Sequence, residues 1–171
     1  GAKEKLPLIS GLDNPRVKRA VDVYMDINLA GKKSVIIGGG FVGCELAVYL
    51  MHHGRHVTVV EQLPEVLENF RSVHPNREML LAMLKESAVT VLTNTTLREI
   101  TDSGVRISVD GADDKSLTAD TVIMATGFLP DCEMLDDLWG NVEQVLRIGD
   151  CVKPGNILNA VWDGFGRGRV V

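Results

Sequence analysis

The clearest hydrophobic pattern in the chain runs from Lys33 to Glu61 and changes its period twice. Residues 35–37 (Val-Ile-Ile) form a β-branched run that predicts a buried strand. Apolar residues then recur at helical spacing, at Leu46, Ala47 and Leu50. Gly54 is placed to end this helix as its C′ residue. A second β-branched run, residues 57–60, stops at Glu61. The pattern therefore predicts a strand–helix–strand unit with parallel strands.

Further periodic segments lie on both sides of this unit. Helices are predicted from Asp13-Asn14-Pro15 to Gly31, from Asn76 through residue 88, and over residues 156–165. The second of these helices has Met79, Leu80, Met83 and Leu84 on its apolar face. Strands are predicted at residues 89–92, 96–101, 105–109, 115–118, 121–126 and 146–148, with extended residues at 1–12 and an irregular or short-helical segment at 62–75. Asp-Ser-Gly and Asp-Gly turns separate the strands between residues 96 and 118, which favours an antiparallel meander there. The expected fold is α/β: a Rossmann-like three-layer domain with a parallel sheet and an inserted antiparallel β-meander.

The turn between the first strand and the helix has the composition of a dinucleotide-binding loop. Its glycines in Gly38-Gly39-Gly40-Phe41-Val42-Gly43 have the G-x-G-x-x-G spacing. Gly38 would permit the tight turn, Gly40 would let the backbone approach a pyrophosphate, and Gly43 would let the helix pack close to the strand. The N–H groups that open the helix favour phosphate. The alternative is a βαβ unit whose glycines only make a tight turn.

Glu61 is the residue that distinguishes NAD(H) from NADP(H). It lies about 20 residues beyond the glycines, where a carboxylate can accept from a ribose 2′-hydroxyl. A 2′-phosphate would be repelled by this carboxylate and would favour arginine just after the strand, where the chain has Gln62 and Leu63. Arg55 precedes the strand and Arg71 lies well beyond it. NAD(H) is therefore favoured, and the alternative is a solvated glutamate.

Composition limits the other classes of function. The chain has 171 residues, enough for one domain with a full core. Its net charge of -5, without long basic runs, argues against nucleic acid and anionic membranes as partners. No apolar run approaches the ~20 residues of a membrane helix, and the first residues do not form a signal peptide. The cysteines Cys44, Cys132 and Cys151 lack the spacing of a disulfide framework or zinc site, so no metal and a reducing, cytoplasmic location are expected.

Four segments together resemble the pyridine nucleotide-disulfide oxidoreductase superfamily, flavoproteins with paired FAD and NAD(P)H domains. They are Gly38–Gly43 followed by Glu45, Glu61 at the end of the second strand, Ala125-Thr126-Gly127-x-x-Pro130, and Ile148-Gly149-Asp150-Cys151. Residues 148–171 look most like the group that carries an old-yellow-enzyme-like barrel: enoate reductases, 2,4-dienoyl-CoA reductase and trimethylamine dehydrogenase. The resemblance covers nearly the whole chain from Lys33 on.

The resemblance implies a set of cofactor-binding residues. They are Gly38, Gly39, Gly40, Phe41, Val42, Gly43, Glu45, Glu61, Gln62, Thr126, Gly127 and Asp150. It places Glu45 near the nicotinamide, although a first-turn glutamate that favours the helix dipole would look the same. Thr126-Gly127 would let the backbone approach the cofactor, or would simply end a strand. Asp150 would contact the ribityl chain of a flavin. No catalytic residue is predicted, because hydride transfer needs no acid or base from this chain.

The resemblance also implies missing partners. A second dinucleotide motif for FAD, a barrel for FMN and a cysteine cluster for iron–sulfur are absent from the sequence, and the last residues resemble an unfinished helix. We therefore expect an excised piece of a larger flavoenzyme. Its ranges are a linker and lead-in helix (1–32), an NAD(H)-binding domain (33–145) and a segment returning to the FAD domain (146–171).

The expected function is to bind NADH and present it to FAD held by absent FAD-binding and barrel domains of the same parent, with no turnover by the fragment alone. A non-redox module that holds ADP, as in trimethylamine dehydrogenase-like proteins, is the alternative. A Rossmann-like methyltransferase is a weaker one, against which the meander and the A-T-G and G-D segments argue.

Overall fold

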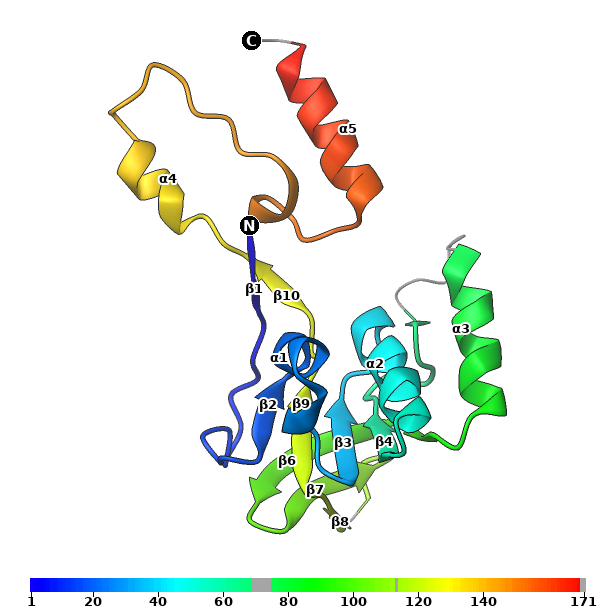
Figure 1. Cartoon of the computed structure of the whole chain (residues 1–171). Helices are drawn as coiled ribbons and strands as arrows, with labels where there is room; N and C mark the ends of the chain where they lie inside the picture. Colours follow the sequence, from blue (N-terminus) through cyan, green and yellow to red (C-terminus); the bar gives the residue numbers. More distant parts are fainter. Residues whose placement is uncertain (69–74, 113, 170–171) are drawn as a thin grey trace. The chain divides into compact units, whose positions relative to one another are not determined.

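The computed structural model describes residues 1–68, 75–112 and 114–169, and the chain forms two compact units (Figure 1). Residues Leu6–Thr126 form the first, here called the sheet unit. Residues Gly1–Lys5 and Gly127–Val171 form the second, here called the C-terminal unit. These units differ from the predicted ranges 1–32, 33–145 and 146–171, because residues 6–32 contribute a strand and a helix to the sheet unit.

The sheet unit is built on a five-stranded parallel sheet with the order β2-β9-β3-β4-β5. Its strands are β2 (Val17–Arg19), β3 (Lys33–Ile37), β4 (His56–Val60), β5 (Thr90–Leu92) and β9 (Thr121–Met124). In the central register Ile36 of β3 lies between Val59 of β4 and Ile123 of β9, and all three are fully buried. Burial on both faces explains why these strands are continuous apolar runs rather than alternating ones.

The two faces of the sheet are covered by different kinds of structure. Helices α1 (Ala20–Met25), α2 (Phe41–His52) and α3 (Pro75–Glu86) and the 3₁₀ turn η1 (Ile27–Leu29) contribute to one core, and β6 (Thr95–Thr101), β7 (Gly104–Val109) and β8 (Lys115–Thr118) to the other. Successive side chains of β3 alternate accordingly: Ile36 joins the helical core, whereas Val35 and Ile37 join the core shared with the antiparallel meander. The predicted α/β fold, with a parallel sheet and an inserted meander, is confirmed.

Helix α2 ends where the glycine signal placed its end. Gly54 has φ +74°, a left-handed conformation that glycine adopts without strain. Its N–H donates to the carbonyl of Met51 at 3.0 Å, and the N–H of Arg55 donates to the carbonyl of Leu50 at 3.1 Å. This pair of bonds is a Schellman motif, which satisfies two terminal carbonyls of the helix.

The predicted helix from Asp13 to Gly31 is wrong at both ends, because α1 covers only Ala20–Met25 and the separate 3₁₀ turn η1 follows it. Asn14 instead makes a turn, in which its Oδ1 accepts from the N–H of Arg16 at 3.0 Å. Residues 17–19 then form β2, which pairs in parallel with β9, and α1 begins only at Ala20. Pairing with a strand more than a hundred residues away overrides the local helical period.

Helix α3 is confirmed, but only half of its predicted apolar face is buried. Leu80 and Leu84 enter the helical core, whereas Met79 and Met83 are exposed. The irregular segment predicted at residues 62–75 is non-helical up to Leu67, and residues 69–74 lie outside the described part of the chain.

The C-terminal unit has secondary structure but no buried side chain among its described residues. It comprises the antiparallel pair β1 (Ala2–Glu4) and β10 (Phe128–Pro130), α4 (Glu133–Leu138), the 3₁₀ turn η3 (Gly149–Cys151) and α5 (Ile157–Gly168). The helix predicted at 156–165 is confirmed, and a reciprocal capping box between Asn156 and Asn159 starts it. The strand predicted at 146–148 is absent, since no described strand pairs with it.

No helix in the described part of the chain has both the length and the apolar content that crossing a bilayer requires.

Candidate dinucleotide-binding site

The glycine-rich turn connects the carboxyl end of β3 to the start of α2. Gly38 has φ +112°, and a Cβ at this position would collide with the carbonyl oxygen of Ala125 just beyond β9. Its N–H donates to the carbonyl of Val60 at 2.9 Å, which fixes the turn to the end of β4. A Cβ on Gly43 would collide with the carbonyl oxygen of Gly38. These two glycines are therefore required by the fold itself.

Gly40 differs from both of them. It is the N-cap of α2, with φ −76° and ψ −175°, an extended conformation open to any residue. A Cβ built on Gly40 would meet no atom within 4 Å. The space in front of the helix N-terminus is thus open, and the first N–H groups of α2 have no carbonyl acceptor within the helix. This arrangement fits a phosphate group, because a side chain here would occupy the volume that a phosphate needs.

The carboxylate of Glu61 is locked onto the same turn. Its Oε2 accepts from the N–H of Gly39 at 2.6 Å, and its Oε1 accepts from the N–H of Leu63 at 2.8 Å. Only 9% of the residue is exposed. Each carboxylate oxygen has a second lone pair, so these bonds leave acceptor capacity for ribose hydroxyls. The neighbouring Gln62 is exposed.

The segment after Glu61 is a part of the site that sequence reasoning missed. Val66 and Leu67 are buried in the helical core, and the N–H of Leu67 donates to the carbonyl of Gly39 at 2.8 Å. A Cβ on Gly39 would lie 2.7 Å from Val66 Cγ1. The post-strand loop therefore braces the glycine turn from outside the sheet. Its apolar residues have no regular period, and only their proximity to the motif hinted at this role.

Cys44 lies directly behind the turn. It is fully buried, and burial together with the Glu61 and Glu45 carboxylates raises the pKa of its thiol to about 12. Its Sγ donates to the carbonyl of Gly39 at 3.4 Å. A neutral, buried thiol of this kind acts as a small core residue rather than as a nucleophile.

The remaining predicted residues fall on both units. Glu45 is exposed on α2, and Thr126 follows the carboxyl end of β9 in the sheet unit. Gly127 and Asp150 belong to the C-terminal unit, where the Oδ1 of Asp150 accepts from the N–H of Gly155 at 3.1 Å. The sheet unit therefore contains most of the predicted site: the glycine turn, Phe41 and Val42 beside it, Glu45, Glu61 and Thr126. The predicted flavin contact, Asp150, belongs to the C-terminal unit.

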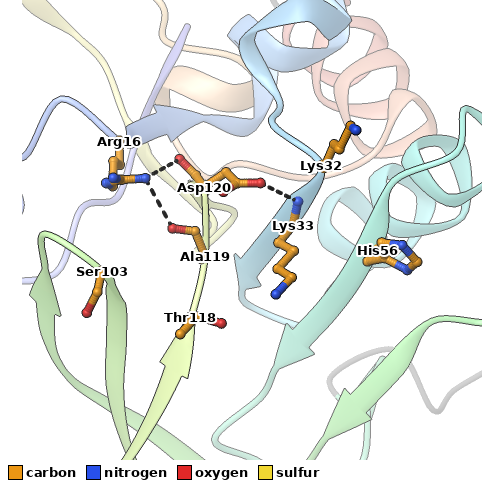
Figure 2. A pocket seen from close by; sticks show the side chains of 8 residues that line it. All are labelled: Arg16, Lys32, Lys33, His56, Ser103, Thr118, Ala119 and Asp120. Carbon is orange, nitrogen blue, oxygen red and sulfur yellow. Dashed lines mark hydrogen bonds between the residues drawn. The ribbon is translucent and has the colours of Figure 1, made fainter.

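A separate hollow of about 440 Å³ lies at the other edge of the sheet, where β3 and β4 begin (Figure 2). Its lining includes the basic residues Arg16, Lys32, Lys33 and His56. The guanidinium of Arg16 donates to the carbonyls that end the β8–β9 connection, and Asp120 Oδ2 accepts from the N–H of Lys33 at 2.8 Å. None of the predicted cofactor-binding residues lines this hollow.

Taken with the parallel sheet, the open glycine turn and the buried terminal glutamate define a Rossmann-type dinucleotide-binding domain. The family model for pyridine nucleotide-disulphide oxidoreductase matches residues 1–164. The chain belongs to this family, and the prediction of an oxidoreductase domain of the class that uses NAD(H) and flavin is confirmed.

Individual relatives have the same domain within longer chains. A cinnamate reductase of Clostridium sporogenes is 31% identical over 166 residues, which cover 96% of this chain and 24% of the relative. A bilirubin reductase of Mediterraneibacter gnavus is 33% identical over 168 residues, which cover 96% of this chain and 25% of the relative. The solved structure of a 2-naphthoyl-CoA reductase in complex with 2-naphthoyl-CoA matches with a TM-score of 0.90 and 29% identity, over 100% of this chain and 26% of that one. The chain thus spans about a quarter of the length of these relatives.

Proposed function

We propose that the chain is the NADH-binding domain of a larger flavoenzyme of the old-yellow-enzyme-like group, which includes the enoate reductases. The observation that carries the proposal is the open N-terminus of α2 at Gly40, beside a Glu61 carboxylate held rigidly by backbone donors. Similarity over 96% of the chain to a cinnamate reductase, and to the 2-naphthoyl-CoA reductase fold, supports the placement in this group.

In this proposal the chain binds and orients the dinucleotide. The N–H groups at the start of α2 hold the pyrophosphate, and Glu61 accepts from the adenosine ribose and disfavours a 2′-phosphate. The bound NADH supplies a hydride for FAD, which the rest of the parent holds. The chain contributes position and exclusion of water rather than an acid or a base.

The C-terminal unit supports the idea of a larger parent. Apolar side chains on α5 are largely exposed, among them Ile157, Val161, Trp162 and Phe165. An exposed apolar stripe on a capped helix fits a surface that packs against other polypeptide. We infer that this unit, with Asp150, docks on the FAD-binding part of the parent, and that the isolated chain does not turn over.

Parallel calorimetric titrations of the chain with NADH, NADPH and ADP test the proposal. NADH is expected to bind more tightly than NADPH, and Glu61→Ala is expected to remove this preference. Glu86→Ala, which removes an exposed carboxylate from the end of α3, is the matched control and should change neither affinity.

Failure of all three ligands to bind would refute the dinucleotide site. Equal affinity for ADP and NADH would instead favour a structural ADP module, since the nicotinamide would then contribute nothing. The full-length parent, titrated next, would show whether the nicotinamide pocket needs the flavin-binding part.

A further inference from the structure

The order of the strands assigns the two halves of a dinucleotide to different sides of β3. Glu61 directly follows β4, so the adenosine half belongs over β4. A ligand whose pyrophosphate lies at the start of α2 must then extend its second half over β9, the neighbour of β3 on the other side. The nicotinamide side of the proposed site is therefore the side of Ala125 and Thr126.

Helix α1 lies on that side. It follows β2, which pairs with β9, and its Ala20 and Val23 share a core with α2. Figure 1 shows α1 beside α2. From α1 the phenol of Tyr24 reaches the first turn of α2, where its O–H donates to the carbonyl of Val42 at 3.5 Å. This element was predicted only as part of a longer lead-in helix, and Tyr24 had no assigned role.

The ring of Tyr24 is held in place by its neighbours. It stacks on Tyr49 with ring centroids 6.0 Å apart, and Tyr49 packs on His53 at 4.4 Å. Tyr49 lies four residues after Glu45, so both side chains project from the same face of α2. Burial and the nearby Glu45 carboxylate raise the pKa of Tyr24 to about 12, so its O–H stays a donor even in alkaline buffer.

The hydroxyl is nonetheless able to change partner. Tyr24 is 40% exposed, and its bond to Val42 is far longer than the ~2.7–2.8 Å typical of O–H···O bonds. If the hydroxyl donates to a better-placed acceptor on a ligand instead, the free energy lost with the Val42 bond is small. The carboxylate of the exposed Glu45 lies near enough to the Tyr24 phenol to act on it electrostatically. The site thus offers an O–H donor and a carboxylate acceptor, and a nicotinamide carboxamide has one acceptor oxygen and an NH₂ donor.

We propose that Tyr24 is a specificity-determining residue for the nicotinamide half: its O–H donates to the carboxamide oxygen while Glu45 accepts from the carboxamide NH₂. The inference rests on the proposed NADH-binding function. It adds a residue from outside the glycine motif, on a helix that precedes the first βαβ strand. Its prediction is that Tyr24 affects the affinity for NADH but not for ADP.

Tyr24→Phe is the test variant and Tyr49→Phe its matched control, because the two substitutions remove the same atom from stacked neighbouring rings. Titration of the chain is expected to show NADH binding weakened about 2- to 10-fold by Tyr24→Phe, the range for one neutral hydrogen bond. ADP binding should stay unchanged, and Tyr49→Phe should alter neither ligand. A global distortion of the turn would instead weaken both ligands equally.

The reduced 3-acetylpyridine analogue of the dinucleotide separates the two contacts. It keeps the carbonyl oxygen and lacks the NH₂ group, so Tyr24→Phe should still weaken its binding, whereas Glu45→Leu, which removes the acceptor, should not. For NADH itself both single variants should bind more weakly. This pattern of losses cannot arise from altered packing alone.

Two results would overturn the inference while leaving the proposed function intact. One is a wild-type preference for NADH over ADP that Tyr24→Phe fails to reduce, and the other is an equal loss for NADH and ADP. A wild-type chain that binds none of these ligands would refute the proposed function, and the role of Tyr24 with it. A wild-type chain that binds ADP and NADH equally would also overturn the role of Tyr24.

Discussion

Replacing Gly40 with alanine separates the folding role of the glycine turn from its binding role. The added methyl group has no neighbour within 4 Å, and the extended backbone at Gly40 accepts it without strain. By contrast, the methyl group of Gly43→Ala would collide with the carbonyl of Gly38. The two substitutions are chemically identical and lie three positions apart on one turn, so each serves as the control for the other.

The expected changes in stability follow from these environments. At Gly40 alanine lowers the conformational entropy of the unfolded chain, which stabilises the folded chain by about 0.4–1 kcal/mol. Alanine is a poorer N-cap than glycine by a similar amount, so the free energy of unfolding should stay within about 1 kcal/mol of wild type. At Gly43 the turn must shift, and overpacking of this kind costs about 1–3 kcal/mol.

Urea unfolding gives the free energy of unfolding of each variant, and calorimetric titration gives its affinity for NADH. Gly40→Ala should unfold like wild type yet bind NADH at least about 10-fold more weakly, because the methyl group occupies the position of the pyrophosphate and such a clash costs more than about 1.4 kcal/mol. Wild-type affinity in a normally folded Gly40→Ala chain would refute the reasoning. The pyrophosphate would then lie elsewhere, and the open space at Gly40 would have no function.

Further predictions concern residues around the same turn. Glu61→Gln should lower the free energy of unfolding by about 1–3 kcal/mol in urea, because an amide cannot accept from both backbone N–H groups that the carboxylate binds. Leu50→Ala, at a fully buried position of α2, should cost about 2–5 kcal/mol in the same assay. Cys44 should resist a thiol reagent at pH 8 in the folded chain and react after unfolding, since burial raises its pKa to about 12. Above pH 10 the free energy of unfolding should fall, because unfolded tyrosine ionises near pH 10 while folded Tyr24 keeps its proton to about pH 12. In Tyr24→Phe the free energy of unfolding should depend less steeply on pH in this range.

The part of the fold that the sequence predicted best is the part determined locally. The packing at Gly43 and the end of α2 at Gly54 depend on residues within a few positions, and the structure has both. The tight turn at Gly38 is also present, although its contacts with Val60 and Ala125 are distant in the sequence. Glycine positions are informative because few other residues tolerate these conformations or contacts.

Elements fixed by distant partners were predicted less well. Residues 17–19 have a helical period, yet they pair with β9 and become a strand. Met79 and Met83 fit a helical stripe with Leu80 and Leu84, yet of these four side chains only the two leucines are buried in the core. The same limit applies to the site: the bond from Leu67 to Gly39 joins segments with no shared motif, so only the folded chain shows it.

The division into two units suggests why binding and electron transfer would separate in this chain. The sheet unit has two buried cores and encloses every residue proposed to hold the adenosine and pyrophosphate. The C-terminal unit, which contains Asp150, buries no described side chain, and a helix as short as α5 is marginal without tertiary packing. We infer that this unit obtains its packing from other polypeptide. Affinity for the dinucleotide should therefore be measurable on the chain alone, whereas contact with a flavin should depend on the surface that covers α5.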